Sequence, residues 1–206
     1  MYGVDLADQS NNGKIHAGVL AAPFVVCLPL ALVGLNASSR LAYNRSAIFE
    51  AGQYWRLLTA HLVHTNFAHA LLNLAAWLFV FWLAKNHLSI QQWEIGFLLC
   101  AVGVDIGLWW CSPNVQWYVG LSGLLHGLLV LSVLMVWRYE RAPIFLVLPG
   151  MAVKLLWEQT QGALPSSNII GHPVIVDAHL FGALSGVLCA LLYALPWLRI
   201  HGNTGK

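Results

Sequence analysis

Long apolar stretches dominate the chain, and short polar segments separate them. The six stretches cover about residues 17–35, 62–83, 93–110, 120–137, 144–157 and 174–197. Most of them approach the ~20 residues that an α-helix needs to cross the hydrocarbon core of a bilayer. Because backbone polar groups inside a bilayer must be satisfied within the segment, the pattern predicts six membrane-spanning helices. We therefore expect an all-α membrane protein built as one six-helix bundle.

Proline lies in the interior of two of the six stretches. Pro23 and Pro29 lie within the first stretch and predict a kinked helix, because proline lacks the N–H that the helical hydrogen-bond ladder needs. Pro149 and Gly150 divide the fifth stretch, which is also the shortest. We therefore expect the fifth helix to be peripheral or mobile.

Two of the polar connections are long. In residues 40–58, arginines and a glutamate alternate with tyrosine, phenylalanine and tryptophan, a mixture that suits the headgroup level of a bilayer. We predict a loop that lies on the membrane surface. Residues 158–172 are predicted to form a second, polar loop.

The overall composition agrees with a membrane protein. Hydrophobic residues make up 59% of the 206 residues and charged residues only 9%, whereas soluble domains carry about 25% charged residues. No basic run indicates nucleic-acid binding. We place a single domain at residues 17–199, between an N-terminal segment (1–16) and a short tail (200–206). The first residues lack a basic segment before a short apolar core, so no cleavable signal peptide is expected.

Orientation follows from the lysines and arginines near the helix ends, which are more frequent on the cytoplasmic side. Six spans place both termini on one side, which carries Lys14, Lys85, Arg138, Arg141, Arg199 and Lys206. The other side carries Arg40, Arg45, Arg56 and Lys154, and only Lys154 remains when the surface loop is set aside. We therefore expect both termini in the cytoplasm. The start of the fourth stretch would then open toward the exterior face.

The best candidate for chemistry is Ser122, which lies between Gly120 and Gly123 at the mouth of the fourth stretch. Glycines on both sides of a serine allow a sharp turn and the close approach of another helix or a substrate. The hydroxyl could therefore act as a nucleophile. Glycine and serine are also ordinary packing residues in membrane helices, so this motif alone leaves both interpretations open.

Polar residues also begin the second stretch. His69 and Asn73 are four residues apart and share one helical face, whereas His64 lies about 140° round the axis or in the entry turn. A metal or haem site is one interpretation. However, the chain has no H-E-x-x-H motif and no C-x-x-C pair, and Glu94, Asp105 and Asp177 show no ligand register with these histidines. We predict no metal, no cofactor and no disulfide.

Four short motifs lie in order along the chain. They are Trp55-Arg56 before the second stretch, His64-x4-His69-x3-Asn73 on it, Gly-Leu-Ser-Gly at 120–123 on the fourth, and Ala178-His179-x2-Gly182-x3-Gly186 on the sixth. Together they resemble the rhomboid family of intramembrane serine proteases. The resemblance implies a six-transmembrane-helix rhomboid-like bundle.

The resemblance also implies roles for individual residues. Ser122 would be the nucleophile, and His179 would be the general base that takes its proton and returns it to the leaving amine. His69 and Asn73, with the backbone N–H of Ser122, would stabilise the oxyanion. Each preorganised donor in such a low-dielectric site is worth about 3 kcal/mol of barrier.

The remaining motif residues would support this dyad. Gly182 and Gly186 would let the sixth helix approach the fourth closely, while Gly120 and Gly123 would keep the space on either side of Ser122 open. Trp55 and Arg56 would belong to the first external loop. His64 would be a structural or water-binding residue.

Two other residues compete for chemical roles near the dyad. His126 lies four residues after Ser122, about 40° away on the same helix face, where many rhomboids have an aromatic residue. It could stack on His179 and orient it, or act as the base itself. Asp177 could be a third triad member, but it points about 160° away from His179 on a helix, so capping or loop contacts are favoured.

The Gly-Leu-Ser-Gly-Leu-Leu-His-Gly run at 120–127 and the bare six-span layout are similar to one branch of the family, the rhombosortases. That branch cleaves a C-terminal Gly-Gly, transmembrane helix and basic-cluster sorting tail from exported bacterial proteins. The implied setting is a bacterial inner membrane, with the lipid bilayer and transmembrane substrates as partners. A general rhomboid protease acting on single-span substrates is the first alternative. An inactive rhomboid-like binder, which retention of Ser122 and His179 disfavours, and a transporter or haem-binding protein are the others.

Overall fold

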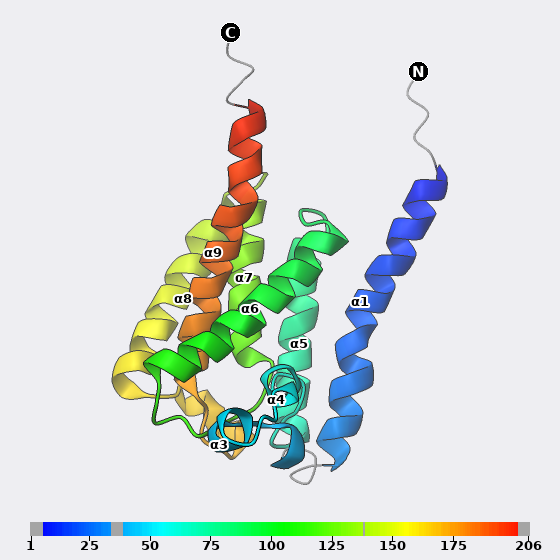
Figure 1. Cartoon of the computed structure of the whole chain (residues 1–206). Coiled ribbons are helices and arrows are strands. Elements are labelled where there is room, and N and C mark those ends of the chain that lie inside the picture. Colours follow the sequence, from blue (N-terminus) through cyan, green and yellow to red (C-terminus); the bar gives the residue numbers. More distant parts are fainter. Residues whose placement is uncertain (1–5, 34–38, 138, 202–206) are drawn as a thin grey trace, which may run out of the picture.

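The computed structural model describes residues 6–33, 39–137 and 139–201, which form the helical bundle of Figure 1. Its six long helices are α1 (Leu6–Val33), α5 (Phe67–Ala84), α6 (Ile90–Cys111), α7 (Ser122–Val136), α8 (Ala142–Gln161) and α9 (Val176–His201). Each predicted apolar stretch overlaps one of them. The outer ends of both predicted terminal segments (1–5 and 202–206), the predicted end of the first stretch and Arg138 lie outside the described residues.

Several of these helices have the length and composition of membrane spans. Among the described residues, three helical segments are long and apolar enough to cross a bilayer, at 67–84, 90–111 and 176–195. Two apolar helical segments, 17–33 and 122–136, are shorter. The helical membrane architecture predicted from the sequence is therefore present. That all six helices cross the membrane stays a prediction.

The connection between α1 and α5 contains short regular elements that the sequence pattern did not predict. They are β1 (Tyr43–Asn44), α3 (Arg45–Phe49) and α4 (Trp55–Thr59), and β1 pairs antiparallel with β2 (Trp117–Tyr118). Tyr43 lies opposite Tyr118 in this ladder. Asn44 caps α3, because its side chain accepts a hydrogen bond from the backbone N–H of Ala47 at 2.9 Å. The ladder fixes the chain shortly before Ser122.

The Trp55-Arg56 pair divides its two side chains between surface and interior. Trp55 is exposed, whereas Arg56 is buried. The Arg56 guanidinium donates to the carbonyl oxygens of Ala42 and Ser39 at 2.9 and 3.2 Å, and to the side-chain oxygen of Gln53 at 2.7 Å. These charge-assisted hydrogen bonds hold the connection against α4.

Helix α7 lies at the centre of the bundle and packs against α5, α6, α8 and α9. Its contact with α9 is the closest, because glycines face each other. A Cβ at Gly182 would overlap the carbonyl oxygen of Gly123, and a Cβ at Gly186 would overlap that of Gly127. The predicted close approach of the two helices is therefore present, and it depends on the missing side chains.

Helix α8 is longer than the sequence pattern predicted. It continues to Gln161 and ends where Gly162 takes φ +82°, a positive φ that residues with a Cβ rarely adopt. The predicted loop at 158–172 was therefore wrong for its first turn. An i,i+4 ion pair between Lys154 and Glu158, at 2.7 Å, supports the extra turn. α8 contacts α7 and α9 at the side of the bundle, which agrees with a peripheral position.

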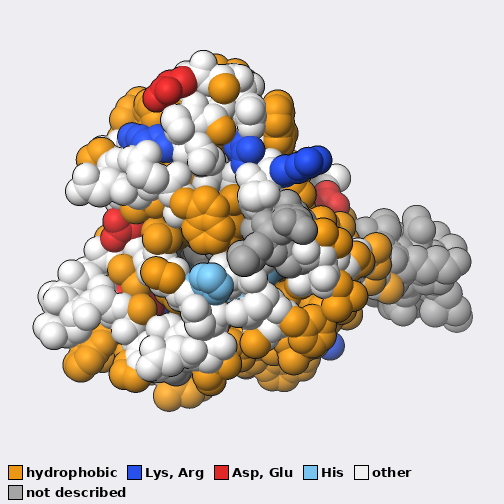
Figure 2. All heavy atoms as spheres, turned by 90° about the horizontal axis from the view of Figure 1, so that it is seen from below, with side chains coloured by type: hydrophobic (Ala, Val, Ile, Leu, Met, Phe, Trp, Pro, Cys, Tyr) orange, Lys and Arg blue, Asp and Glu red, His pale blue; other side chains and the backbone are white. Residues whose placement is uncertain are grey.

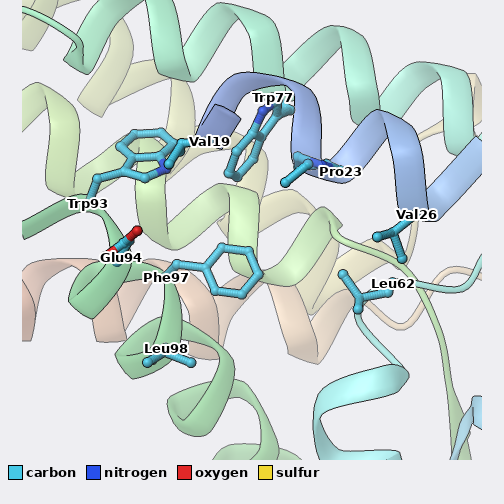
Figure 3. A pocket seen from close by; sticks show the side chains of 10 residues that line it. Val19, Pro23, Val26, Leu62, Trp77, Trp93, Glu94, Phe97 and Leu98 are labelled. Atoms are coloured by element: carbon cyan, nitrogen blue, oxygen red, sulfur yellow. The ribbon is translucent and has the colours of Figure 1, made fainter. Parts of the chain in front are cut away.

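Helix α1 stands at the opposite side and packs against α5. The indole N–H of Trp77 donates to the carbonyl oxygen of Leu20 at 3.2 Å. Between α1, α5 and α6 lies a cavity of about 480 Å³ with an apolar wall that includes Trp77, Trp93 and Phe97, and with Glu94 among its lining residues (Figure 3). No residue of the predicted dyad or oxyanion site lines it.

The two ends of the bundle differ. Helix α1 begins and α9 ends at one end, while α3 and α4 lie at the other (Figure 1). Figure 2 looks at the latter end, where hydrophobic side chains cover much of the surface and charged and histidine side chains lie between them. A surface of this mixed kind suits the boundary between lipid and water.

Candidate active site

Ser122 is the first residue of α7. The chain reaches it through a sharp turn in which Gly120 has φ +112°, a conformation that residues with a Cβ rarely adopt. The turn is held on both sides: Gly120 donates its N–H to the carbonyl oxygen of Ala60 at 2.9 Å, and the Tyr118 hydroxyl donates to the Gly120 carbonyl oxygen at 2.6 Å. The N–H of Ser122 belongs to the first helical turn, whose amides have no partner within the helix and favour negative charge nearby.

The Ser122 side chain faces His179 on α9. The distance between Ser122 Oγ and His179 Nε2 is 3.0 Å, which is within hydrogen-bond range. His179 is buried, with an exposed fraction of 4%. The two residues lie 57 positions apart, and the glycine contact between α7 and α9 brings them together.

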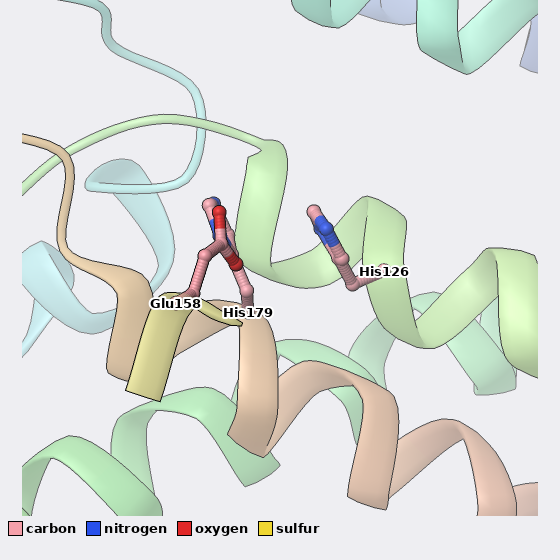
Figure 4. Close-up of side chains that lie close together, drawn as sticks. All are labelled: His126, Glu158 and His179. Atoms are coloured by element: carbon pink, nitrogen blue, oxygen red, sulfur yellow. The ribbon is translucent and has the colours of Figure 1, made fainter. Parts of the chain in front are cut away.

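The other ring nitrogen of His179 faces a carboxylate. Its Nδ1 lies 2.9 Å from Oε2 of Glu158, whose side chain on α8 is 3% exposed. The second carboxylate oxygen, Oε1, accepts a hydrogen bond from Nζ of Lys154 at 2.7 Å. Figure 4 shows the Glu158 and His179 side chains next to each other, with His126 on the neighbouring helix. Neither Glu158 nor Lys154 was assigned to the site from the sequence.

His126 stacks on His179. Their ring centroids lie 4.2 Å apart and the ring planes differ by 14°. Nδ1 of His126 lies 2.7 Å from the carbonyl oxygen of Ser122, so an N–H there donates to the backbone. The Ser122 hydroxyl contacts His179, and the geometry gives His126 the position of a support under the His179 ring.

His69 and Asn73 lie against the turn that precedes Ser122. A Cβ at Gly120 would come within 2.9 Å of ring atoms of His69 and 3.4 Å of Nδ2 of Asn73. Nδ1 of His69 pairs with the Thr65 hydroxyl at 3.2 Å, which leaves Nε2 on the side of Gly120. Both residues are buried.

The amide nitrogen of Asn73 has no hydrogen-bond partner in the part of the chain that the structure describes. A buried donor without a partner costs about 1–3 kcal/mol, so a donor kept in this state points to an acceptor supplied from outside the chain. Asn73 shares a cavity of about 250 Å³ with the other polar residues of the site, namely His69, Ser122, His126, Lys154, Glu158 and His179.

The other predicted residues lie near the site without facing Ser122. His64, between α4 and α5, is buried and meets His69 edge to face, with ring centroids 4.9 Å apart. Burial, and next the proximity of His69, lower the pKa of His64 to about 3. Gly123 packs on α9, where a Cβ would lie 2.9 Å from the Ala178 carbonyl oxygen. Asp177 accepts a hydrogen bond from the Ser112 hydroxyl at 2.5 Å, so its carboxylate serves a loop contact.

One group of residues has the composition of a metal site. The ligand atoms of His126, Glu158 and His179 all lie within 4.8 Å of one another. Three such ligands can bind zinc when they converge on one point. Here the two imidazole rings are stacked nearly parallel, the Glu158 carboxylate is paired with Lys154, and His126 Nδ1 contacts a carbonyl oxygen. This arrangement fits a set of contacts that holds the His179 ring in place better than it fits a tetrahedral cation site.

Comparison with known proteins identifies relatives of this chain. Residues 51–196 match the family model described as the Rhomboid domain. The chain is 29% identical over 154 residues to Rhomboid-like protein 11, chloroplastic, of Arabidopsis thaliana, an alignment that covers 70% of this chain and 52% of that protein. It is 28% identical over 151 residues to the putative rhomboid protease YdcA of Bacillus subtilis, covering 68% of each. The chain thus spans about half the length of the first relative and two thirds of the second. Because the family model covers most of the chain, from the Trp-Arg pair to the last helix, this protein belongs to the rhomboid family.

Proposed function

We propose that the protein is an intramembrane serine endopeptidase in which Ser122 is the nucleophile and His179 the general base. The observation that carries this proposal is the 3.0 Å contact between Ser122 Oγ and His179 Nε2 at the first turn of α7. Rhomboid proteases act on transmembrane substrates within a lipid bilayer, and one relative is named a putative rhomboid protease.

The geometry supports acyl transfer in two steps. In the first, His179 Nε2 accepts the Ser122 proton as Oγ attacks the carbonyl carbon of the scissile peptide, and the imidazolium then protonates the leaving amine. In the second, a water molecule gives its proton to His179 and attacks the ester carbon. Collapse of the tetrahedral intermediate returns the proton to Ser122 Oγ and frees the carboxylic acid product.

Three donors would bind the oxyanion that forms in each step. The Ser122 N–H lies at the positive end of α7, and the Asn73 amide, which has no partner among the described residues, lies against Gly120. His69 would donate from Nε2 if the Thr65 hydroxyl donates to its Nδ1. Such donors act most strongly where the cavity excludes water.

The proposed substrates are transmembrane proteins that end in a Gly-Gly sequence, a transmembrane helix and a basic cluster, as for the rhombosortases. The run at 120–127 and the unusual His126 support this narrower assignment. We place the protein in a bacterial inner membrane with both termini in the cytoplasm. The turn before Ser122 follows β2, which pairs with β1 at the end of the bundle that carries α3 and α4. Because α1 begins and α9 ends at the opposite end (Figure 1), the site would open to the exterior face. A general rhomboid protease is the second candidate, favoured by the family match.

A reporter cleavage assay tests the proposal. The purified protein in detergent is mixed with a reporter that carries a Gly-Gly, apolar-span and arginine-cluster tail. We expect Ser122→Ala to abolish cleavage, and Ser132→Ala to leave it unchanged. Ser132 is the matched control because it lies on the same helix, where its hydroxyl is buried and donates to the Leu128 carbonyl oxygen at 2.6 Å.

Two further outcomes separate the alternatives. A reporter whose Gly-Gly is replaced by Val-Val should resist cleavage by a tail-specific enzyme; equal cleavage of both reporters would favour a general rhomboid protease. If the wild-type protein binds either reporter without cutting it, the chain is an inactive binder. Cleavage by Ser122→Ala at a wild-type rate would exclude the serine mechanism.

A further inference from the structure

A buried carboxylate stands behind the proposed base. The Glu158 side chain is 3% exposed and the His179 side chain 6%, and Oε2 of Glu158 lies 2.9 Å from Nδ1 of His179. The second ring nitrogen of His179, Nε2, lies 3.0 Å from Ser122 Oγ. Glu158 on α8, His179 on α9 and Ser122 on α7 therefore form a continuous series of hydrogen-bond contacts.

The hydrogen bonds at the two ring nitrogens of an imidazole are linked through its tautomer. A neutral ring carries one N–H, and a carboxylate can only accept a hydrogen bond. The Glu158 contact therefore places the proton of His179 on Nδ1 and leaves the lone pair of Nε2 directed at the Ser122 hydroxyl. This is the tautomer that a general base needs.

Lys154 gives this arrangement a second possible state. Its Nζ lies 2.7 Å from Oε1 of Glu158 but also 3.4 Å from Nδ1 of His179. If the ammonium donated to Nδ1, the ring proton would move to Nε2, and His179 could no longer accept the proton of Ser122. The Lys154 ammonium is closer to the Glu158 carboxylate than to His179. The carboxylate therefore holds the ammonium at Oε1, and Nδ1 of His179 contacts Oε2 of Glu158.

Burial makes the ion pair sensitive to the loss of either partner. Removing one member of a buried pair leaves an uncompensated charge and is strongly destabilising, whereas removing both can be nearly neutral. The Lys154 side chain is 29% exposed, so its charge is partly solvated. The Glu158 carboxylate depends on both its neighbours.

We propose that Glu158 is the third member of a Ser122–His179–Glu158 triad, a positioning residue that acts through His179, with Lys154 holding its carboxylate. The inference rests on the proposed function. Glu158 keeps its negative charge throughout: it fixes the tautomer before the attack and stabilises the imidazolium after His179 has accepted the proton. Its own protonation is not part of any step.

Two other residues could claim the role, and the geometry disfavours both. Asp177 lies two positions from His179 in sequence, but its Oδ2 accepts from Ser112 at 2.5 Å. Lys154 could itself be a base in principle, but its short contact is with Glu158, and the Ser122 hydroxyl contacts His179.

The first test compares Glu158→Gln with Asp177→Asn in the full-length protein. Both changes replace a carboxylate by an amide close to His179 in space or in sequence. The glutamine side chain introduced by Glu158→Gln can offer an N–H to Nδ1 and so favours the wrong tautomer. We expect kcat on the reporter to fall about 100- to 10,000-fold in Glu158→Gln with KM nearly unchanged, as when the carboxylate of a triad is replaced by its amide. Asp177→Asn should keep kcat within a few fold, and Glu158→Asp should recover part of the loss.

The second test reads the tautomer directly, which a merely structural role would not change. In protein labelled with ¹⁵N-histidine, the signals of His179 are assigned by their loss in His179→Ala. The wild type should show N–H at Nδ1, whereas Glu158→Gln should show N–H at Nε2 or a mixture. The double variant Lys154→Gln/Glu158→Gln removes both charges together. It keeps the experiment decisive if Glu158→Gln alone fails to fold, and it should also lose activity.

The results distinguish this inference from the proposed function. If a folded Glu158→Gln or double variant keeps at least half of the wild-type kcat and the same His179 tautomer, Glu158 is not a triad member; the protease proposal still stands in that case, provided that Ser122→Ala is inactive. If Ser122→Ala cleaves the reporter as well as the wild type does, the proposed function fails and the triad fails with it.

Discussion

Substituting Gly120 tests whether the turn before Ser122 sets the oxyanion site. Gly120 has φ +112°, and an added Cβ would lie 2.9 Å from ring atoms of His69 and 3.4 Å from Nδ2 of Asn73. Ordinary contacts of a Cβ begin near 3.4 Å, so the His69 ring must move by about 0.5 Å. The backbone conformation itself costs about 1–3 kcal/mol with a Cβ present.

These two effects predict separate losses in Gly120→Ala. The strain should lower the midpoint of thermal unfolding in detergent by several degrees, since 1 kcal/mol corresponds to about 2–4 °C in a domain of this size. The displaced His69 should lower kcat on the reporter by about tenfold or more, because a misplacement of 1 Å can cost about 100-fold. KM should change little, as expected for a donor used in the transition state.

Gly52→Ala is the matched control. Gly52 also has a positive φ, of +68°, but the nearest atom to its added Cβ would be Tyr54 Cε2 at 4.0 Å, far from the serine. This variant should lose stability without losing kcat. If Gly120→Ala kept both the wild-type kcat and the wild-type unfolding midpoint, the turn would not constrain the site and the placement of His69 would have to be revised.

Three further predictions concern single side chains of the site. Asn73→Ala should lower kcat about 10- to 1,000-fold with little change in KM; an effect on KM alone would make Asn73 a binding residue. His126→Phe keeps a ring under His179 and should retain measurable cleavage, whereas His179→Phe should have none; equal loss in both would give His126 a chemical role. His64 has a pKa lowered to about 3 from the usual 6.5, so the free energy of unfolding should be intact above pH 6.5 and fall as the pH drops toward 3. The slope of the unfolding free energy against pH gives the number of protons taken up on unfolding, and His64→Leu should reduce that number by up to about one. An unchanged slope would show that His64 is already protonated or exposed.

The helices were predictable from the sequence, because a long apolar run in a bilayer satisfies its backbone hydrogen bonds within the segment only as a helix. The runs at 62–83 and 174–197 became α5 and α9 with shifts of only a few residues at their N-terminal ends. A close helix contact at Gly182 and Gly186 was also predictable, because these glycines recur one turn apart on one face. Pairing Ser122 with His179 rested on resemblance to a family, since helical spacing alone cannot show which two helices meet.

Glu158 was missed because the pattern around it is ambiguous. The fifth stretch is short, contains Pro149, and is followed by a polar run, so its end looked like a loop. The i,i+4 spacing of Lys154 and Glu158, together with Gly162 four residues later, is the signal that could have extended the helix. The strands β1 and β2 have two residues each, and so short a ladder leaves no periodic pattern to detect.

In the proposed mechanism, Ser122 is a nucleophile activated by His179. The most direct test is to treat the purified protein with a fluorophosphonate, which forms a covalent bond to an activated serine, and to locate the adduct by mass spectrometry. We predict an adduct on Ser122 in the wild type and in Ser132→Ala, and none in Ser122→Ala or in folded His179→Ala. An adduct on another residue, or undiminished labelling of Ser122→Ala, would exclude Ser122 as the activated nucleophile.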